Sequence, residues 1–250
     1  MCSGLVAWPV READRVLRFM RDFIEEAPDE VGLMANLRIA PALPFVPTGL
    51  VGEPIIAVVA CYVGSVPDGE VALRPIRALG SPSIDTVGPH PYVAHQRIVD
   101  ASVPHGNHYY WKAAKLPRLT DELIATITRH AEELPTPHSA IPIFCQGGAV
   151  ARVAEDATAF PSRDARHDIN MLASWSPGDP NGARHREWAR AFHDAVAPHA
   201  AGVYVNFVSD EKDDVLTSVY GEEKLARLRS IKRTYDPANV FHYNANIAPG

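Results

Sequence analysis

The 250 residues are 46% hydrophobic and 22% charged, with a formal net charge of −6 at pH 7. A chain of this size and composition can bury a sizeable core without disulfide or metal staples, and its three cysteines are too scattered for either. The acidic balance, without a Lys/Arg stripe, excludes an electrostatic nucleic-acid binder. With no signal-peptide pattern and no apolar run near the ~20 residues of a membrane span, we expect a cytoplasmic protein that does not bind membranes.

Strand-like and helix-like segments alternate along the chain. The expected strands are 4–10, 54–64, 105–116, 140–146, 169–175 and 202–210, with a further apolar run at 31–41 and a Pro- and Gly-rich connection through 41–53. The run 54–64, PIIAVVACYVG, is nearly all apolar and β-branched, which is typical of a strand buried on both faces.

The helices are indicated by apolar periodicity and by their end signals. The first has an apolar stripe at helical spacing, formed by Val16, Phe19, Met20, Phe23, Ile24 and Ala27. Further helices are expected near 68–79, from Thr120 as N-cap, at 182–197, and at 222–234 before a stop at Asp236-Pro237. Together these elements predict an α+β fold, a mostly antiparallel sheet with helices on one face, in a single domain.

Several catalytic motifs are absent from the sequence. It contains no G-x-G-x-x-G after a strand, no Walker A loop, no G-x-S-x-G elbow and no H-E-x-x-H. His105 and His108 flank a Gly-Asn pair without nearby carboxylate or thiolate ligands, so we predict no metal site there. Composition and periodicity alone predict a soluble α+β domain and no specific function.

The C-terminal part resembles a known family. The matching segments, in the family's order, are DTVGPHPYVAHQRIVD (85–100), YYWKAAKL (109–116), GGAVARVAEDATAFPSRDA (147–165), WARAFHDAVAP (188–198), YVNF (204–207) and YGEEKLARLRSIKRTYDPANVFHYNANI (220–247). Taken together they are similar to the berberine-bridge-enzyme-like FAD-linked oxidases, over nearly the whole chain.

The resemblance implies an FAD cofactor, with substrate binding and flavin binding assigned to separate domains. Residues 1–250 are similar to that family's substrate-binding domain, whose antiparallel sheet covers the flavin ring. The segment 220–250 resembles the terminal tail that packs on the flavin-binding domain. The flavin-cradling glycines, and the His and Cys that attach FAD covalently, are expected before residue 1, so FAD binding would need a separate FAD-binding chain or a longer parent.

Residues carried over from the family fall near the end of the chain. Tyr204 matches the tyrosine that acts as general base, and Asn206 matches a position that contacts the flavin. Strand alternation over 202–210 would place both on one face, away from the core. Asn244 and Asn246 match the junction of the tail with the flavin domain; an Asn-x-Asn pair is otherwise typical of a turn. A packing role for Tyr204 and a sheet-edge hydrogen bond for Asn206 are the alternatives.

The pocket residues implied by the resemblance are less typical. Phe144 and Gln146 fall where relatives place a second pocket residue, commonly Tyr or an acid, and neither is an obvious base. Tyr110 and Lys112 lie on an aromatic strand, one face of which is expected to line the pocket while the rest packs in the core. Ser162 stands where relatives often carry His.

Two functions follow from these observations. The first is the substrate-binding part of an FAD-dependent oxidoreductase that oxidises an alcohol, sugar or secondary metabolite by hydride transfer. The alternative is a non-catalytic module that binds a small molecule or a partner, such as a second copy of the chain, through the face that meets the flavin domain in relatives.

Overall fold

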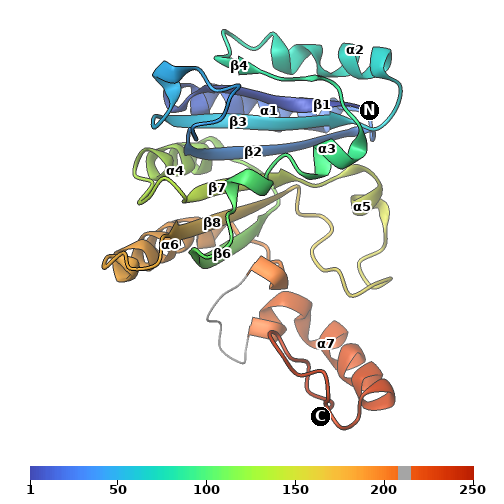
Figure 1. Cartoon of the computed structure of the whole chain (residues 1–250). Coiled ribbons are helices and arrows are strands. Elements are labelled where there is room, and N and C mark those ends of the chain that lie inside the picture. Colours follow the sequence, from blue (N-terminus) through green and yellow to red (C-terminus); the bar gives the residue numbers. More distant parts are fainter. Residues whose placement is uncertain (208–214) are drawn as a thin grey trace.

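The computed structural model describes residues 1–207 and 215–250, and one antiparallel sheet runs through its centre (Figure 1). The strand order is β4-β1-β3-β2-β7-β8-β6, with β5 pairing beside β4 on β1. The strands are β1 (Cys2–Pro9), β2 (Val31–Ile39), β3 (Pro54–Tyr62), β4 (Ile84–Asp85), β5 (Gly88–Pro89), β6 (His108–Leu116), β7 (Ala140–Cys145) and β8 (His167–Trp175). Every pairing between them is antiparallel, which confirms the predicted α+β class.

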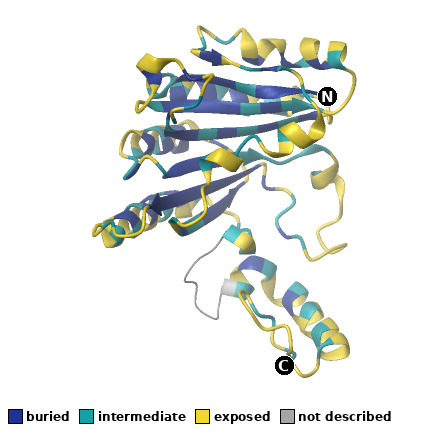
Figure 2. Ribbon diagram, in the orientation of Figure 1, coloured by how far each residue is buried: buried dark blue, intermediate teal, exposed yellow. Residues whose placement is uncertain are grey.

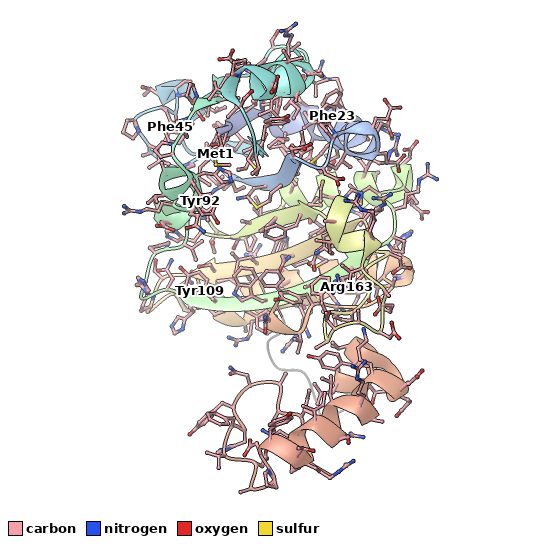
Figure 3. The ribbon with its side chains drawn as sticks, turned by 90° about the vertical axis from the view of Figure 1, so that its right-hand side faces the viewer. Met1, Phe23, Phe45, Tyr92, Tyr109 and Arg163 are labelled. Atoms are coloured by element: carbon pink, nitrogen blue, oxygen red, sulfur yellow. The ribbon has the colours of Figure 1, made fainter. Side chains whose placement is uncertain are left out.

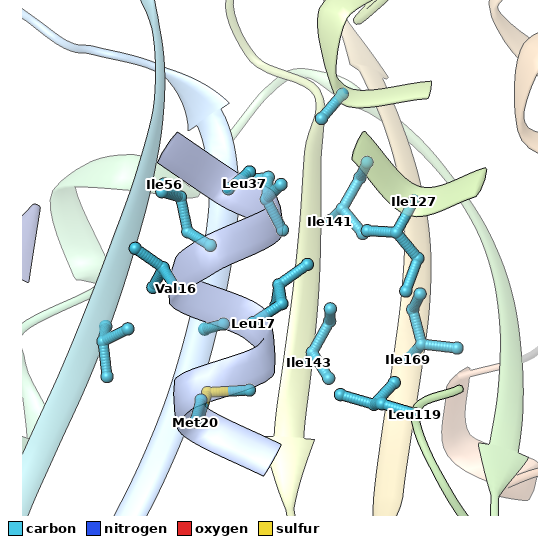
Figure 4. Close-up of a cluster of buried hydrophobic side chains, with 14 of the residues drawn as sticks. Val16, Leu17, Met20, Leu37, Ile56, Leu119, Ile127, Ile141, Ile143 and Ile169 are labelled. Atoms are coloured by element: carbon cyan, nitrogen blue, oxygen red, sulfur yellow. The ribbon is translucent and has the colours of Figure 1, made fainter. Parts of the chain in front are cut away.

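The main core lies between this sheet and the helices on one of its faces. The helices are α1 (Ala13–Glu26), α2 (Val66–Arg77), α3 (Tyr92–Gln96), α4 (Asp121–Glu132), α5 (Gly148–Arg152), α6 (Gly182–Val196) and α7 (Val215–Tyr235). Side chains of α1, α2, α4 and α6 share one cluster with alternate residues of β1, β2, β3, β7 and β8. In Figure 4, Val16, Leu17 and Met20 of α1 point toward the strand residues. Four helices therefore cover one face, as predicted.

Local signals in the sequence explain where these helices begin. The Thr120 hydroxyl accepts a hydrogen bond from the backbone N–H of Leu123 at 3.2 Å, so the predicted N-cap of α4 is confirmed. Ser65 caps α2 in the same way through Asp68. Burial of their apolar faces then docks both helices on the sheet.

The opposite face of the sheet is only partly covered. A smaller apolar cluster forms where the connection after β2, with Val46 and Leu50, packs on Ile55 and Ala57 of β3. The segment with α3 and a 3-10 turn (Asp100–Ser102) lies in front of β2 and β7 in Figure 1. Figure 3 shows Phe45 and Tyr92 on this side and Phe23 of α1 on the other. We call this side the open face.

The predicted strand at 202–210 is wrong for residues 202–207, and 208–210 lie outside the described residues. Gly202 makes an isolated bridge with Lys115, at the end of the β6 edge. The chain then turns into a 3-10 segment (Val205–Phe207), closed by a 2.9 Å bond from the N–H of Phe207 to the carbonyl of Tyr204. The chain therefore leaves the edge of β6 directly after this bridge.

The last helix and the tail extend away from the sheet (Figure 1) and are largely exposed (Figure 2). Helix α7 begins earlier than the predicted 222 and is interrupted at Gly221, whose φ is 69°. After the helix stops, the Asp236 carboxylate accepts hydrogen bonds from the N–H groups of Val240 and Phe241, at 2.8 and 3.1 Å. The Asp-Pro stop therefore also holds the tail back against its own helix.

Candidate active site

The strand register places polar and aromatic side chains in rows across the open face. One row is Arg38, Ala140, Leu172 and Trp111; the next is Asn36, Pro142, Asn170 and Ala113; the third is Met34, Phe144, Asp168 and Lys115. Directly opposed residues of paired strands lie on the same face. The third row brings a carboxylate, an ammonium group and an aromatic ring together on neighbouring strands.

An aromatic cluster covers one end of this row. Phe207 stacks on Trp111 and on Phe144, with ring centroids 5.6 and 5.9 Å apart. Tyr204 meets the edge of Phe207 at 5.2 Å, and its other neighbour is Phe160 at 5.9 Å. Such an array offers a broad apolar surface to a flat ligand ring.

Tyr204 carries the polar group of this cluster. Its hydroxyl oxygen accepts a 2.8 Å hydrogen bond from the side-chain amide of Asn206. The tyrosine is half-buried and the asparagine is exposed. A donor aimed at the phenolic oxygen stabilises negative charge that develops there.

Lys115 lies buried beneath the cluster. Its ammonium group donates a 2.7 Å hydrogen bond to the carbonyl of Pro161 and sits 3.8 Å from the ring centroid of Phe160. Burial lowers the pKa of Lys115, while Asp168 opposes that shift. This lysine therefore fixes Phe160, and with it one wall of the cluster.

Asp168 is a buried carboxyl in the same row. Burial raises the pKa of Asp168 to about 6, although Lys115 and a hydrogen bond from Asn170 act in the opposite direction. One of its oxygens accepts that 3.1 Å bond, and the other is buried without a partner. A carboxyl that titrates near neutrality beside an aromatic pocket is a candidate acid or base.

A loop and the start of α7 close the other side of the cluster. Glu155 accepts hydrogen bonds from the backbone N–H groups of Ser162 and Arg163, both at 3.0 Å. The ammonium group of Lys224 donates to the same carboxylate at 2.7 Å. Burial raises the pKa of Tyr220, with Tyr204 contributing to the shift, so the beginning of α7 lies near the site.

Three comparisons bear on this geometry. The family model "Berberine and berberine like" matches residues 203–248, the segment that carries Tyr204, Asn206, α7 and the tail. An FAD-linked oxidoreductase of Dictyostelium discoideum is 29% identical over 78% of this chain and 42% of its own length. An uncharacterized FAD-linked oxidoreductase of Bacillus subtilis is 30% identical over 75% of this chain and 42% of its own length. The C-terminal segment is thus a berberine-bridge-enzyme-like domain, and the chain is similar to FAD-linked oxidoreductases.

The fold agrees with this assignment. A crystal structure of 6-hydroxy-D-nicotine oxidase from Arthrobacter nicotinovorans superposes with a TM-score of 0.79 at 20% identity, over 100% of this chain and 55% of that one. The chain thus spans about half the length of the relatives it matches.

The predicted pocket residues separate into two groups. Phe144 joins the aromatic cluster, whereas Gln146 lines an adjoining cleft of about 330 Å³ that also reaches Phe160. Tyr110 lies on the helix side of the sheet, where its hydroxyl accepts a 2.9 Å bond from Arg190 of α6. Strand alternation places Lys112 on the same side as Tyr110.

The Gly147-Gly148 pair allows a close approach of the backbone to Asp29. Gly148 has a φ of +51°, and a Cβ built there would lie 2.8 Å from a carboxylate oxygen of Asp29. This turn forms the rim of the cleft beside Gln146.

The predicted cofactor residues lie in two places. Asn206 borders the aromatic cluster, but Asn244 and Asn246 lie in the tail, where the N–H of Asn246 donates to the carbonyl of Asn244 at 2.8 Å. The side-chain oxygen of Gln146, which lines the cleft, is buried without a partner, and so is that of Asn246 in the tail. An unsatisfied amide oxygen such as that of Gln146 suits the N–H edge of a flavin ring, whereas the sequence lacks a glycine-rich cradle for the phosphates of FAD.

The sequence reasoning missed Trp111, Lys115, Phe160 and Asp168 as members of the site. Their signal is cross-strand register, which brings 115 opposite 168 and 168 opposite 144. Within the described residues, no cluster of His, Cys, Asp and Glu side chains could hold a metal ion. No helix in the described ranges is both long and apolar enough to cross a membrane.

Proposed function

We propose that this chain provides the substrate-binding face of an FAD-dependent oxidoreductase that oxidises an alcohol, sugar or secondary metabolite. The observation that carries the proposal is the open face itself, where the Tyr204–Asn206 pair borders an aromatic cluster over Asp168 and Lys115. The family relationship supports the flavin chemistry, and the arrangement of side chains supports substrate binding at this face.

The chain's own residues can perform the proton part of such a reaction. Oxidation of an alcohol removes a proton from its oxygen and a hydride from its carbon, and bound FAD supplies the hydride acceptor. Tyr204 would take the proton as a phenolate, and the amide of Asn206 would stabilise its negative charge before the transfer leaves a neutral phenol. The rings of Phe207, Trp111 and Phe144 would orient the substrate and exclude water.

Asp168 is the second group that could hold a proton here. Its raised pKa keeps part of its population protonated near neutrality, and its free oxygen is buried under the cluster. Because that oxygen is enclosed, we assign Asp168 to the floor of the site and Tyr204 to contact with the substrate.

The test combines this chain with a flavin-binding partner. The chain is purified, mixed with FAD alone or with the separately produced flavin-binding segment of the Bacillus subtilis relative, and freed of unbound cofactor. We expect a retained, perturbed flavin absorption band in the mixture with the partner segment, and its bleaching by a panel of alcohols and sugars without oxygen.

Tyr204→Phe should slow that bleaching by about 10²–10⁴-fold, while Tyr62→Phe, a change on the helix side of the sheet, should not alter it. A complex that retains flavin but is never reduced, or a Tyr204→Phe variant as fast as the unaltered chain, would contradict the proposal.

A second candidate function is supported by the exposure of the tail. Tyr235, Phe241 and Tyr243 are each more than 80% exposed, and surfaces of this kind commonly mark association sites. On this proposal the chain is a non-catalytic binding module that associates with a second copy or another protein through the tail. Sedimentation of the chain alone, together with the flavin-segment mixture, distinguishes the two proposed functions. A stable homodimer that never binds a flavin segment favours the non-catalytic module.

A further inference from the structure

A second, small cavity lies on the open face at the other end of the rows. It has a volume of about 60 Å³ and is covered by the connection after β2, with Leu43 and Phe45, and by Ile98 and Val99 after α3. Its floor is formed by β1, β2 and β3, and most of its lining is apolar. The cavity therefore has walls contributed by this chain itself.

Arg38 is the charged residue of this cavity. It is 9% exposed, yet no carboxylate of residues 1–207 or 215–250 forms an ion pair with it. Its Nε donates a 3.3 Å hydrogen bond to the carbonyl of Ile39. Burial lowers the pKa of Arg38, but a guanidinium group remains charged in proteins. A buried cation without a counter-ion is unfavourable, so an anion bound here would offset that cost.

Asn36 lies beside Arg38 on the same face of β2. Its side-chain oxygen is buried without a hydrogen-bond partner, and the residue also lines the cavity. That oxygen is an acceptor and does not itself bind an anion, but the NH₂ group of the same side chain can donate to an acceptor that binds the guanidinium. Two polar side chains thus line an otherwise apolar cavity, an arrangement typical of a small-molecule site.

We propose that this cavity binds the carboxylate group of a small molecule, with Arg38 as its counter-ion and Asn36 beside it. The planar fork of a guanidinium matches a carboxylate through two parallel hydrogen bonds. The cavity holds about as much as two waters at ~30 Å³ each, so it admits the carboxylate end of a molecule and excludes a nucleotide phosphate chain. A small molecule fits better than a protein side chain because the cavity is already covered by the chain's own segments.

The position of the cavity relative to the aromatic cluster indicates the class of substrate, and this step rests on the proposed function. Arg38 and Trp111 occupy the two ends of one row, three strand spacings apart, or about 14 Å. A substrate held by its carboxylate at Arg38 would extend over β7 and β8 to the aromatic cluster. The substrate class is then a carboxylate-bearing molecule of roughly that length.

The experiment needs no flavin. Thermal unfolding of the 250-residue chain is followed by tryptophan fluorescence during titration with isobutyrate, and separately with isobutyramide, which has the same shape without the charge, at constant ionic strength. We expect isobutyrate alone to raise Tm in a saturable way. Arg38→Gln should weaken isobutyrate binding about tenfold to a hundredfold. Arg97→Gln, which removes an exposed arginine paired with Asp100 on the neighbouring segment, should leave it unchanged.

A second variant keeps the test valid if Arg38→Gln does not fold. Leu43→Trp fills the cavity and leaves Arg38 in place, so it should also remove the response to isobutyrate. An equal response to isobutyramide, or a response retained in either variant, would overturn the site. Isobutyrate binding with no flavin reduction in any mixture would instead overturn the proposed function and leave the carboxylate site standing.

Discussion

Asp168 and His167 are neighbours on β8 that point to opposite faces of the sheet, and burial moves their pKa values in opposite directions. Burial raises the pKa of Asp168 to about 6, and burial together with Arg166 and Arg21 lowers the pKa of His167 to about 4. Folded Asp168 holds its proton more tightly than the unfolded chain does, so its contribution to stability falls as pH rises from about 4 to about 6. For His167 the unfolded chain binds the proton more tightly, so its contribution rises between about pH 4 and about pH 6.5. The two effects are each about 3 kcal/mol and nearly cancel.

At the residue scale we therefore predict that single substitutions expose pH dependences of stability that nearly cancel in the unaltered chain. Asp168→Asn should make the free energy of unfolding rise by about 3 kcal/mol between about pH 4 and about pH 7, because only the His167 effect remains. His167→Gln should make it fall over a similar range, because only the Asp168 effect remains. Urea denaturation at several pH values measures both, and profiles that match the unaltered chain would contradict the assignment.

At the scale of elements, Glu155 ties the loop before β8 to helix α7. Its carboxylate accepts from two backbone N–H groups of the loop and from Lys224 of the helix. Arg227 adds a 2.7 Å hydrogen bond from α7 to the backbone carbonyl of Asp156. Since the same loop carries Phe160, this junction also positions one wall of the aromatic cluster.

We predict that Glu155→Ala loosens this junction without unfolding the sheet. The amide protons of α7 should exchange faster, with a local loss of about 1–3 kcal/mol, since two backbone donors lose their acceptor and Lys224 keeps only backbone carbonyl partners. Asp156→Ala is the matched control, because Arg227 contacts the backbone carbonyl of Asp156 and not its carboxylate. Hydrogen exchange measured by mass spectrometry gives the comparison, and equal exchange in the two variants would rule out this role for Glu155.

At the scale of the whole molecule, the tail is folded yet presents its aromatic side chains to the outside. Lys232 donates to the carbonyl of Phe241 at 2.6 Å, and Arg233 donates to the carbonyl of Pro249 at 3.1 Å, so the tail lies along its own helix. Phe241 and Tyr243 are 81% and 82% exposed. Backbone contacts thus fix the tail while its rings remain available to a partner.

We predict that Phe241→Ser combined with Tyr243→Ser weakens binding of the flavin-binding segment at least tenfold, because exposed aromatics are frequent hot spots of interfaces. The free energy of unfolding should change by less than about 0.5 kcal/mol, since both rings are exposed. Val71→Ser, which changes an exposed side chain of α2 on the helix side of the sheet, is the control. Titration calorimetry measures the affinity for the flavin-binding segment, and undiminished affinity in the double variant would place the interface elsewhere.

The fold class, the helix-covered face of the sheet and the resemblance to the oxidase family could all be predicted from the sequence. Periodicity in α1, the cap at Thr120 and the apolar run of β3 depend on neighbouring residues, and the structure confirms each of them. The family segments likewise gave Tyr204 and Asn206, which the structure brings into hydrogen-bond contact.

Which side chains share the open face depends on the tertiary structure. Residues 38 and 111 share one row across four strands, and 115 lies opposite 168, through a register that no local pattern encodes. Two expectations also failed because they depend on contacts between distant segments. The 202–207 segment makes one bridge to β6 and then leaves the sheet, and alternation placed Tyr110 against α6 rather than on the open face. Burial, which sets the pKa of Asp168 and leaves Arg38 without a counter-ion among the described residues, arises only when distant segments pack together.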